Sequence, residues 1–342
     1  MKIILKNNKG SILVFTLWVV SLLTIFAVQI GLTIRQRTTL LSRIETRSTL
    51  RHIAEAGIKK SLSALKLDLE RNNQIYTAFG KYYRHNNPQK FNNIFVGNGV
   101  SQVQYNKFDT IGADPILRYG FVDEERKLNI NLADHVELER LIENTTQIAH
   151  DEARDIANAI ISWREIGDTE LAGFYSDDYY SQLEYPYEVK GAPFETISEL
   201  RLLRSVTEII YETLKPFITT YGSGRVNINT VSPQVLNALG VSTTLIDKIL
   251  IVRKGLDGID DTADDYMFYK TFDIAAEIIN FMELEISEIQ QIDYLNTAGK
   301  ITTNSFYYFI ESVATLGLKK EVFTAECVYN LNENKIEYWQ EK

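Results

Sequence analysis

Five aspartates lie within nine residues of the second half of the chain, around a glycine: Asp257, Asp260, Asp261, Asp264 and Asp265. Hard cations such as calcium prefer several carboxylate oxygens of this kind. The spacing differs from that of an EF-hand, which needs ligands at fixed alternate positions and a terminal glutamate. Two interpretations therefore stay open: a calcium-binding loop, or a solvated acidic loop whose last aspartate caps the next helix.

A second acidic group lies upstream and comprises Asp168, Glu170, Asp177 and Asp178. Its spacing is looser, so it is the poorer candidate for a calcium site.

The remaining residues show no pattern of an enzyme active site, so we expect the protein not to be an enzyme. The four histidines are scattered without ligand spacing, and Cys327 falls in an expected strand and has no second cysteine to pair with. Gly222-Ser-Gly224 lacks the remainder of a nucleotide-binding fingerprint.

The amino-terminal segment determines how the chain is placed in the cell. Residues 11–34 contain no charged side chain, and as a helix they would extend about 36 Å, which is enough to cross the hydrocarbon core of a membrane. The remainder of the 342 residues has the composition of a soluble protein. With a net charge of −9, the chain is expected to be repelled by nucleic acid and by anionic lipid surfaces.

The periodicity beyond this segment predicts a helical rod, a sheet and a helical insert. Apolar residues recur at three- and four-residue steps from Leu50 to Leu65, which indicates that the anchor helix continues as an amphipathic helix. Strands are expected over 101–108 and 115–121 and, far along the chain, over 306–314, 322–329 and 335–339. Helical periodicity dominates the stretch from 128 to 299 between them.

The insert contains an internal repeat with an offset of 98 positions, which matches Leu128-Asn-Ile-Asn131 with Val226-Asn-Ile-Asn229. It predicts two related helical subdomains, about 128–220 and 226–299, the second with a helix that begins at Pro233 after a Ser232 cap. The repeat also resembles helix-hairpin-helix modules, which bind DNA phosphate. Here the turn reads Gly240-Val-Ser242 and lacks the second glycine, so we expect no nucleic-acid binding.

The order of the leader and the apolar run resembles a type IV prepilin or pseudopilin. The leader carries three lysines and ends in Lys9-Gly10, directly before Ser11. The resemblance implies cleavage by a prepilin peptidase between Gly10 and Ser11, methylation of the new amino terminus, and a leader on the cytoplasmic side. The alternative is an uncleaved signal anchor. Most members of these families have a glutamate at the fifth mature position, where this chain has Phe15, which is expected of a subunit at a special place in the filament.

The insert resembles the general secretion pathway protein K family, the largest minor pseudopilins of type II secretion systems. Besides 226–240, the segments that carry this resemblance are Trp163-Arg164, 177–180, 185–187, Ala192-Pro193 and 198–203, in the family's order. Glu165 and Gly167 depart from an aspartate-x-aspartate pattern that is usual after the tryptophan, which puts a ligand role there in doubt.

The resemblance implies an α+β, type IV pilin-like fold with a large inserted α-helical domain. The expected organisation is a leader (1–10), a transmembrane helix (11–34), a pilin helix with the first strands (35–127), the insert (128–299) and the last strands (300–342). A non-enzymatic subunit at the tip of the pseudopilus is implied, anchored in the inner membrane with its body in the periplasm. Its expected partners are the I-, J- and H-type minor pseudopilins and the major pseudopilin, with calcium as a structural ligand. A minor pilin of a type IV pilus or competence pseudopilus, and a membrane-tethered DNA-binding protein, are the alternatives.

Overall fold

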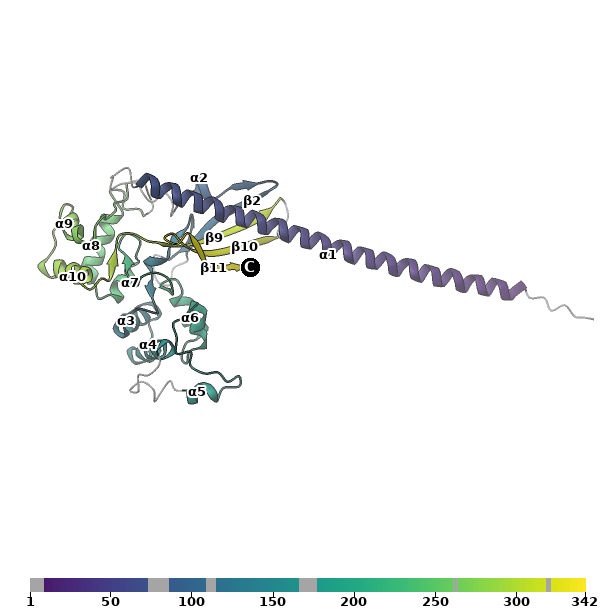
Figure 1. Cartoon of the computed structure of the whole chain (residues 1–342), viewed down its shortest axis with the longest axis horizontal. Helices are drawn as coiled ribbons and strands as arrows, with labels where there is room; N and C mark the ends of the chain where they lie inside the picture. Colours follow the sequence, from purple (N-terminus) through teal and green to yellow (C-terminus); the bar gives the residue numbers. More distant parts are fainter. Residues whose placement is uncertain are drawn as a thin grey trace, which may run out of the picture.

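The computed structural model describes residues 9–72, 86–108, 115–165, 177–260, 262, 264–317 and 321–342. A single long helix, α1 (Lys9–Asn72), projects from a body that consists of a sheet and a helical insert (Figure 1). The amino-terminal half of α1 stands free of the body, and its carboxyl-terminal half packs on the sheet. The helix therefore joins an anchor to a folded domain without a break.

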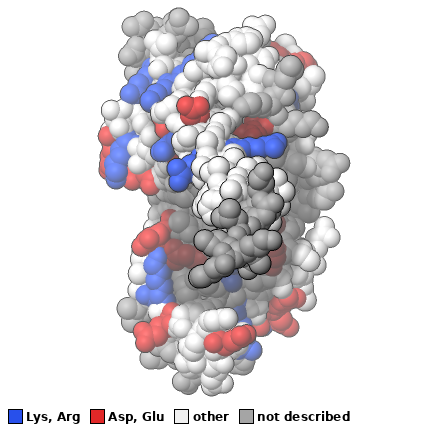
Figure 2. Space-filling model, turned by 90° about the vertical axis from the view of Figure 1, so that its right-hand side faces the viewer, with Lys and Arg blue, Asp and Glu red and all other residues white. Residues whose placement is uncertain are grey.

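The free half of α1 has the properties of a membrane anchor. Its large apolar side chains from Ile12 to Ile44 are exposed, and the most apolar window of the helix has a mean hydropathy of 2.3. Within the described residues, α1 is the one helix long and apolar enough to span a bilayer. Figure 2 looks along this helix from the anchor side, with the body behind it. One amino-terminal helix thus provides a single membrane span.

The packed half of α1 buries the predicted apolar stripe. Leu50, Ile53, Ala54, Ile58 and Leu65 are at most 2% exposed, and they form one hydrophobic core with the sheet. A stripe at three- and four-residue steps lies along one side of a helix, so a single face can cover a sheet. The sequence-based prediction of an amphipathic continuation of the anchor is therefore confirmed.

The sheet has seven antiparallel strands, and segments from the two ends of the chain build it together. Its main order is β1-β2-β9-β10-β11, with β3 paired to β2 and β4 paired to β9. The bounds are β1 (Ile94–Val96), β2 (Gly99–Lys107), β3 (Ile116–Tyr119), β4 (Val122–Asp123), β9 (Tyr307–Leu316), β10 (Val322–Asn330) and β11 (Lys335–Glu341). A short helix, α2 (Pro88–Phe91), precedes β1. All five predicted strands are present, with ends shifted by up to two residues.

The insert follows β4 and returns the chain to β9. Its α-helices are α3 (His135–Thr146), α4 (His150–Arg164), α5 (Asp177–Ser181), α6 (Glu208–Leu214), α7 (Pro233–Ala238), α8 (Thr243–Arg253), α9 (Ile274–Ile279) and α10 (Ile286–Thr297). The described part of the insert also has the 3-10 helices η1 (Glu124–Arg126), η2 (Ile197–Leu202) and η3 (Thr271–Asp273). Helices α8 to α10 lie beyond the end of α1 that is farthest from the anchor, and α3 to α6 lie to one side of the sheet (Figure 1).

The internal repeat has a structural counterpart, a short parallel strand pair in each half of the insert. Strand β5 (Leu128–Asn129) pairs with β6 (Ile218–Thr219), and β7 (Val226–Asn227) pairs with β8 (Ile301–Thr302). Strand β8 thus lies within the insert, and the chain rejoins the pilin sheet at Tyr307. The two halves share one continuous hydrophobic core, with α3 packed against α7.

The second asparagine of each repeat has the same task in both copies. The Asn131 side chain binds the backbone of Phe194 through both its donor and its acceptor, and Asn229 binds the backbone of Phe268 in the same way. An amide group can satisfy an N–H and a C=O of an extended segment at once. The repeated Asn-x-Asn motif therefore fastens an irregular segment to the core of each subdomain.

Candidate functional site: the junction between the pilin sheet and the insert

The processing and assembly residues of the sequence analysis lie on α1. Gly10 and Ser11 belong to its first turns, and their side chains are outside the described ones. Phe15 follows on the free half of the helix and is 70% exposed. An apolar side chain at this depth of a membrane requires no charged partner. Cleavage after Gly10 and the assembly role of Phe15 stay predictions.

Three consecutive acidic residues are buried where the sheet meets the insert. Asp123 ends β4, and Glu124 and Glu125 begin η1; each is at most 3% exposed. Buried carboxylates are costly unless donors satisfy them, so each must have specific partners. The sequence analysis did not single out these residues, although an unbroken acidic run three positions before Leu128 could have drawn attention to them.

Asp123 joins the sheet to the second subdomain. Its Oδ2 atom accepts hydrogen bonds from Asn227 Nδ2 at 2.9 Å and from Thr230 Oγ1 at 2.7 Å. Its Oδ1 atom accepts one from the backbone N–H of Glu125 at 2.7 Å. Burial raises the pKa of Asp123 above its usual range, and these hydrogen bonds oppose that rise. Ionisation of the Asp123 carboxyl therefore destabilises the folded state.

Glu124 and Glu125 bind two other parts of the chain. Glu124 accepts a hydrogen bond from Thr219 Oγ1 at 2.7 Å and pairs with Lys127 at 2.6 Å. Glu125 accepts one from the backbone N–H of Phe306 at 2.7 Å, directly before β9. Burial raises the pKa of Glu125 as well. The acidic run therefore fixes the first subdomain, the second subdomain and the start of β9 relative to one another.

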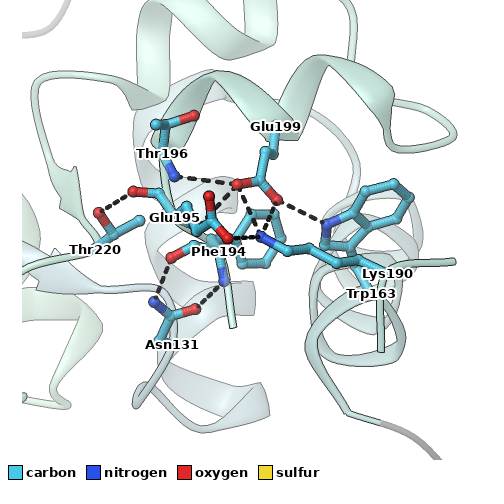
Figure 3. Close-up of polar contacts among 8 residues, drawn as sticks. All are labelled: Asn131, Trp163, Lys190, Phe194, Glu195, Thr196, Glu199 and Thr220. Carbon is cyan, nitrogen blue, oxygen red and sulfur yellow. Dashed lines mark hydrogen bonds and ion pairs between the residues drawn. The ribbon is translucent and has the colours of Figure 1, made fainter. Parts of the chain in front are cut away.

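Two of the segments that carry the family resemblance meet in the first subdomain, where Trp163 lies beside Glu199 (Figure 3). Glu199 accepts hydrogen bonds from Trp163 Nε1 at 3.3 Å and from Lys190 Nζ at 3.0 Å. The backbone N–H groups of Glu195 and Thr196 donate to the same carboxylate. Burial would raise the pKa of Glu199, but these donors hold it below its usual value.

Aromatic rings pack beside these polar contacts. The Trp163 ring lies edge-on to Tyr180 at 5.9 Å between centroids and to Tyr187 at 6.2 Å. Tyr180 is 1% exposed. Trp163, Tyr180 and Tyr187 thus pack together in the core of this subdomain. The motif segments of this subdomain are therefore structural.

Several carboxylates of the predicted calcium loop bind groups of the protein itself. Asp264 accepts hydrogen bonds from the backbone N–H groups of Leu256 and Asp257, and Asp257 accepts one from Ile259. Among the described side chains, which leave out Asp261, no three histidine, cysteine or acidic groups are placed to hold a metal. Calcium at this loop therefore stays a prediction.

Asp260 and Asp265 also have specific places in the folded body. Asp260 pairs with Lys107 of β2 at 2.8 Å, so it joins the loop to the sheet. Burial opposes its ionisation, but the charges of Arg253 and Lys107 lower the pKa of Asp260 to about 2. Asp265 is buried, and the next helical element, η3, has Lys270 at its N-cap position. The expectation that the last aspartate caps the next helix is therefore wrong, because the chain runs on in non-helical form after Asp265.

The second acidic group lies partly outside the described residues. Asp168 and Glu170 lie outside the described residues. Asp177 and Asp178 begin α5, and their side chains are outside the described ones. A calcium site at this group therefore stays a prediction as well.

The hairpin that resembles a DNA-binding module uses its backbone amides within the chain. The N–H groups of Gly240 and Val241 donate to the carbonyls of Asn237 and Leu236, and that of Ser242 donates to Gln291 Oε1 at 2.8 Å. The turn lies against α3, because a Cβ on Gly240 would be 2.9 Å from the Arg140 guanidinium. Its amides therefore bind groups of the second subdomain, while the turn itself packs against α3.

Comparisons with known proteins agree with this architecture. Residues 122–223, which include the acidic run and the Trp163 core, match the family described as type II secretion system protein K. No curated protein sequence matches the chain. The structure resembles a chain of the solved GspK-GspI-GspJ complex of the type 2 secretion system of enterotoxigenic Escherichia coli. That match has a TM-score of 0.56 and 16% identity, and it covers 87% of this chain and 99% of the other. Residues 122–223 are therefore similar to the type II secretion system protein K family, and the chain as a whole has a pilin-like fold with an inserted helical domain, like the matched chain of that complex.

Proposed function

We propose that this chain is the tip subunit of a type II secretion pseudopilus, and that it starts or caps the filament as part of a complex of minor pseudopilins. Its body would lie in the periplasm, and its leader would be removed by a prepilin peptidase. The I- and J-type minor pseudopilins are the first partners of this complex. The H-type subunit and the major pseudopilin follow below them. In this role the chain is not an enzyme.

The position of the insert is the observation that supports a tip location most directly. Helices α8 to α10 lie beyond the membrane-distal end of α1, where another pilin-like subunit would have to stack in a continuing filament (Figure 1). The hydrogen bonds of Asp123, Glu124 and Glu125 hold the insert firmly to the sheet. Phe15 adds a second argument, because it has no carboxylate for the amino terminus of a neighbouring subunit.

The proposed complex is tested with the parts of the subunits that remain when the membrane-spanning segments are removed. We expect residues 35–342 of this chain to form a stable three-way complex with the matching regions of the I- and J-type subunits, measured by size-exclusion chromatography with light scattering. The major pseudopilin body alone is the control and should remain separate. A chain that binds neither subunit, with or without calcium, would contradict the tip proposal. A salt-sensitive affinity for DNA would favour the tethered DNA-binding alternative instead.

Calcium is proposed for the loop 257–265 on the strength of its sequence, and a thermal titration decides it. We expect the melting temperature to rise with calcium concentration, because a ligand that binds only the native state stabilises it. Magnesium at the same concentration is the control for ionic strength. Asp260→Asn is the matched variant, since it removes one carboxylate of the loop. An unchanged melting temperature at millimolar calcium would remove the site.

A further inference from the structure

A basic segment follows the membrane-spanning part of α1, in an otherwise acidic protein. Between residues 35 and 51 the chain has five arginines and one glutamate, whereas its net charge is −9. Two of these arginines bind the body: Arg47 lies over the Phe323 ring, and Arg51 pairs with Glu55 and Glu341. The remaining three, Arg35, Arg37 and Arg43, we call the arginine collar.

The collar lies on the free part of α1. Its three side chains are exposed, and within the described residues none of them forms an ion pair with another part of the chain. Figure 2 shows Lys and Arg side chains on two sides of the helix when it is viewed from the anchor. Arg35 and Arg43 also border a shallow groove on the helix surface, together with Gln36, Thr39 and Leu40. The collar is therefore open to a ligand outside the chain.

Apolar side chains accompany the collar. Leu40, Leu41 and Ile44 are each more than half exposed. A segment that mixes arginine with exposed leucine and isoleucine is typical of the boundary between lipid and water, where the apolar groups reach the acyl chains and the guanidinium groups reach the headgroups. The position fits, since Arg35 comes directly after the 24 uncharged residues 11–34. Side chains on a helix also tilt toward its amino end, which here is the membrane side.

The distribution of the collar around the helix favours a lipid over a protein partner. Arg35 and Arg37 are two positions apart, so at about 100° per residue they point to nearly opposite sides of α1. A single protein partner covers one side of a helix, whereas a layer of headgroups surrounds it. We propose that the arginine collar binds the phosphate groups of anionic phospholipids in the leaflet where the chain leaves the membrane. The proposal rests on membrane insertion of α1, but not on the tip location.

The full-length chain is tested in nanodiscs made of equal parts phosphatidylglycerol and phosphatidylcholine. Native mass spectrometry of the ejected protein counts the retained lipids of each kind. We expect the wild type to retain phosphatidylglycerol several-fold over phosphatidylcholine, since each arginine near an anionic surface favours binding by roughly fivefold. The R35Q/R37Q/R43Q variant should lose this preference. The K59Q/K60Q variant, which changes two exposed lysines farther along the same helix, should keep it.

Membrane insertion of α1 is measured separately, so that a failure to insert is not mistaken for a failure of the arginine collar to bind lipid. Trp18 is exposed in the apolar run, and brominated lipids should quench its fluorescence equally in the wild type and in the arginine variant. Equal retention of both lipids by the inserted wild type would overturn the proposal, as would an undiminished preference in the arginine variant. A variant that keeps the preference but no longer joins the I- and J-type subunits would assign the collar to a neighbouring pseudopilin instead.

Discussion

Replacing Asp123 by alanine is expected to lower the free energy of unfolding of the body by about 3 kcal/mol, because three buried donors lose their acceptor together. Those donors are Asn227 Nδ2, Thr230 Oγ1 and the Glu125 N–H group. Denaturant unfolding of residues 35–342 measures the change. The expected structural consequence is a second subdomain that is held less firmly to the sheet.

The matched control for Asp123 is Asp151→Ala, which removes an exposed carboxylate on α4. The Asp151 side chain is 83% exposed and pairs with Arg154 of the same helix. Its loss should cost less than about 0.5 kcal/mol, as for most surface ion pairs. Equal effects of the two substitutions would show that the acidic run does not hold the junction together.

The pH dependence of the Asp123 effect has a defined sign. Burial raises the pKa of Asp123 above its ordinary value of 3.8. The stabilising contribution of its protonated form is complete below that value and is lost as the pH rises through the folded-state pKa. The stability advantage of the wild type over Asp123→Asn should therefore be greatest in acid and shrink toward neutral pH. An advantage that grows with pH would contradict the raised pKa.

Replacing Gly57 by valine is expected to cost about 3 kcal/mol, because α1 approaches the sheet too closely for any side chain at this position. A Cβ on Gly57 would lie 2.0 Å from Ser101 Oγ and 2.5 Å from Ser312 Oγ. These two hydroxyl groups are buried and hydrogen-bonded to each other at 2.8 Å. The helix must therefore move away from β2 and β9, or the hydrogen bond must break. Thermal or denaturant unfolding measures the loss.

Two further variants separate this close contact from helix propensity. Ser63→Val places the same β-branched residue on an exposed position of the same helix and should have little effect. Adding Ser101→Ala and Ser312→Ala to Gly57→Ala removes the two nearest atoms and should restore part of the lost stability. If the triple variant is no more stable than Gly57→Ala, the clash with the hydroxyl groups is not the cause.

The local elements could be predicted from the sequence because each depends on short-range periodicity. The stripe from Leu50 to Leu65, the five predicted strands and the helix that begins at Pro233 with a Ser232 cap are all present. The 98-residue repeat was visible for the same reason, since Asn131 and Asn229 perform the same task in both copies. Patterns of this kind persist in the structure when one face of an element is buried.

The junction could not be predicted in this way, because its partners are far apart in the chain. Glu124 meets Thr219, 95 positions away, and Glu125 meets Phe306, 181 positions away. In the sequence, an acidic run has the same appearance whether its carboxylates are buried and hydrogen-bonded or exposed to solvent on a surface loop. The loop with Asp260 gives a second example, because its contacts with Lys107 and with backbone amides could not be predicted from the charge cluster.

The sequence by itself therefore determined an apolar anchor that continues into a pilin helix, a sheet split between the two ends of the chain, and a repeated helical insert. Hydrophobic periodicity carries this information, since it depends only on neighbouring residues. Only the tertiary structure decided where the insert lies relative to α1 and which carboxylates hold it there. The burial and pairing of a charged group depend on donors brought together by folding, and such donors leave no periodic pattern in the sequence.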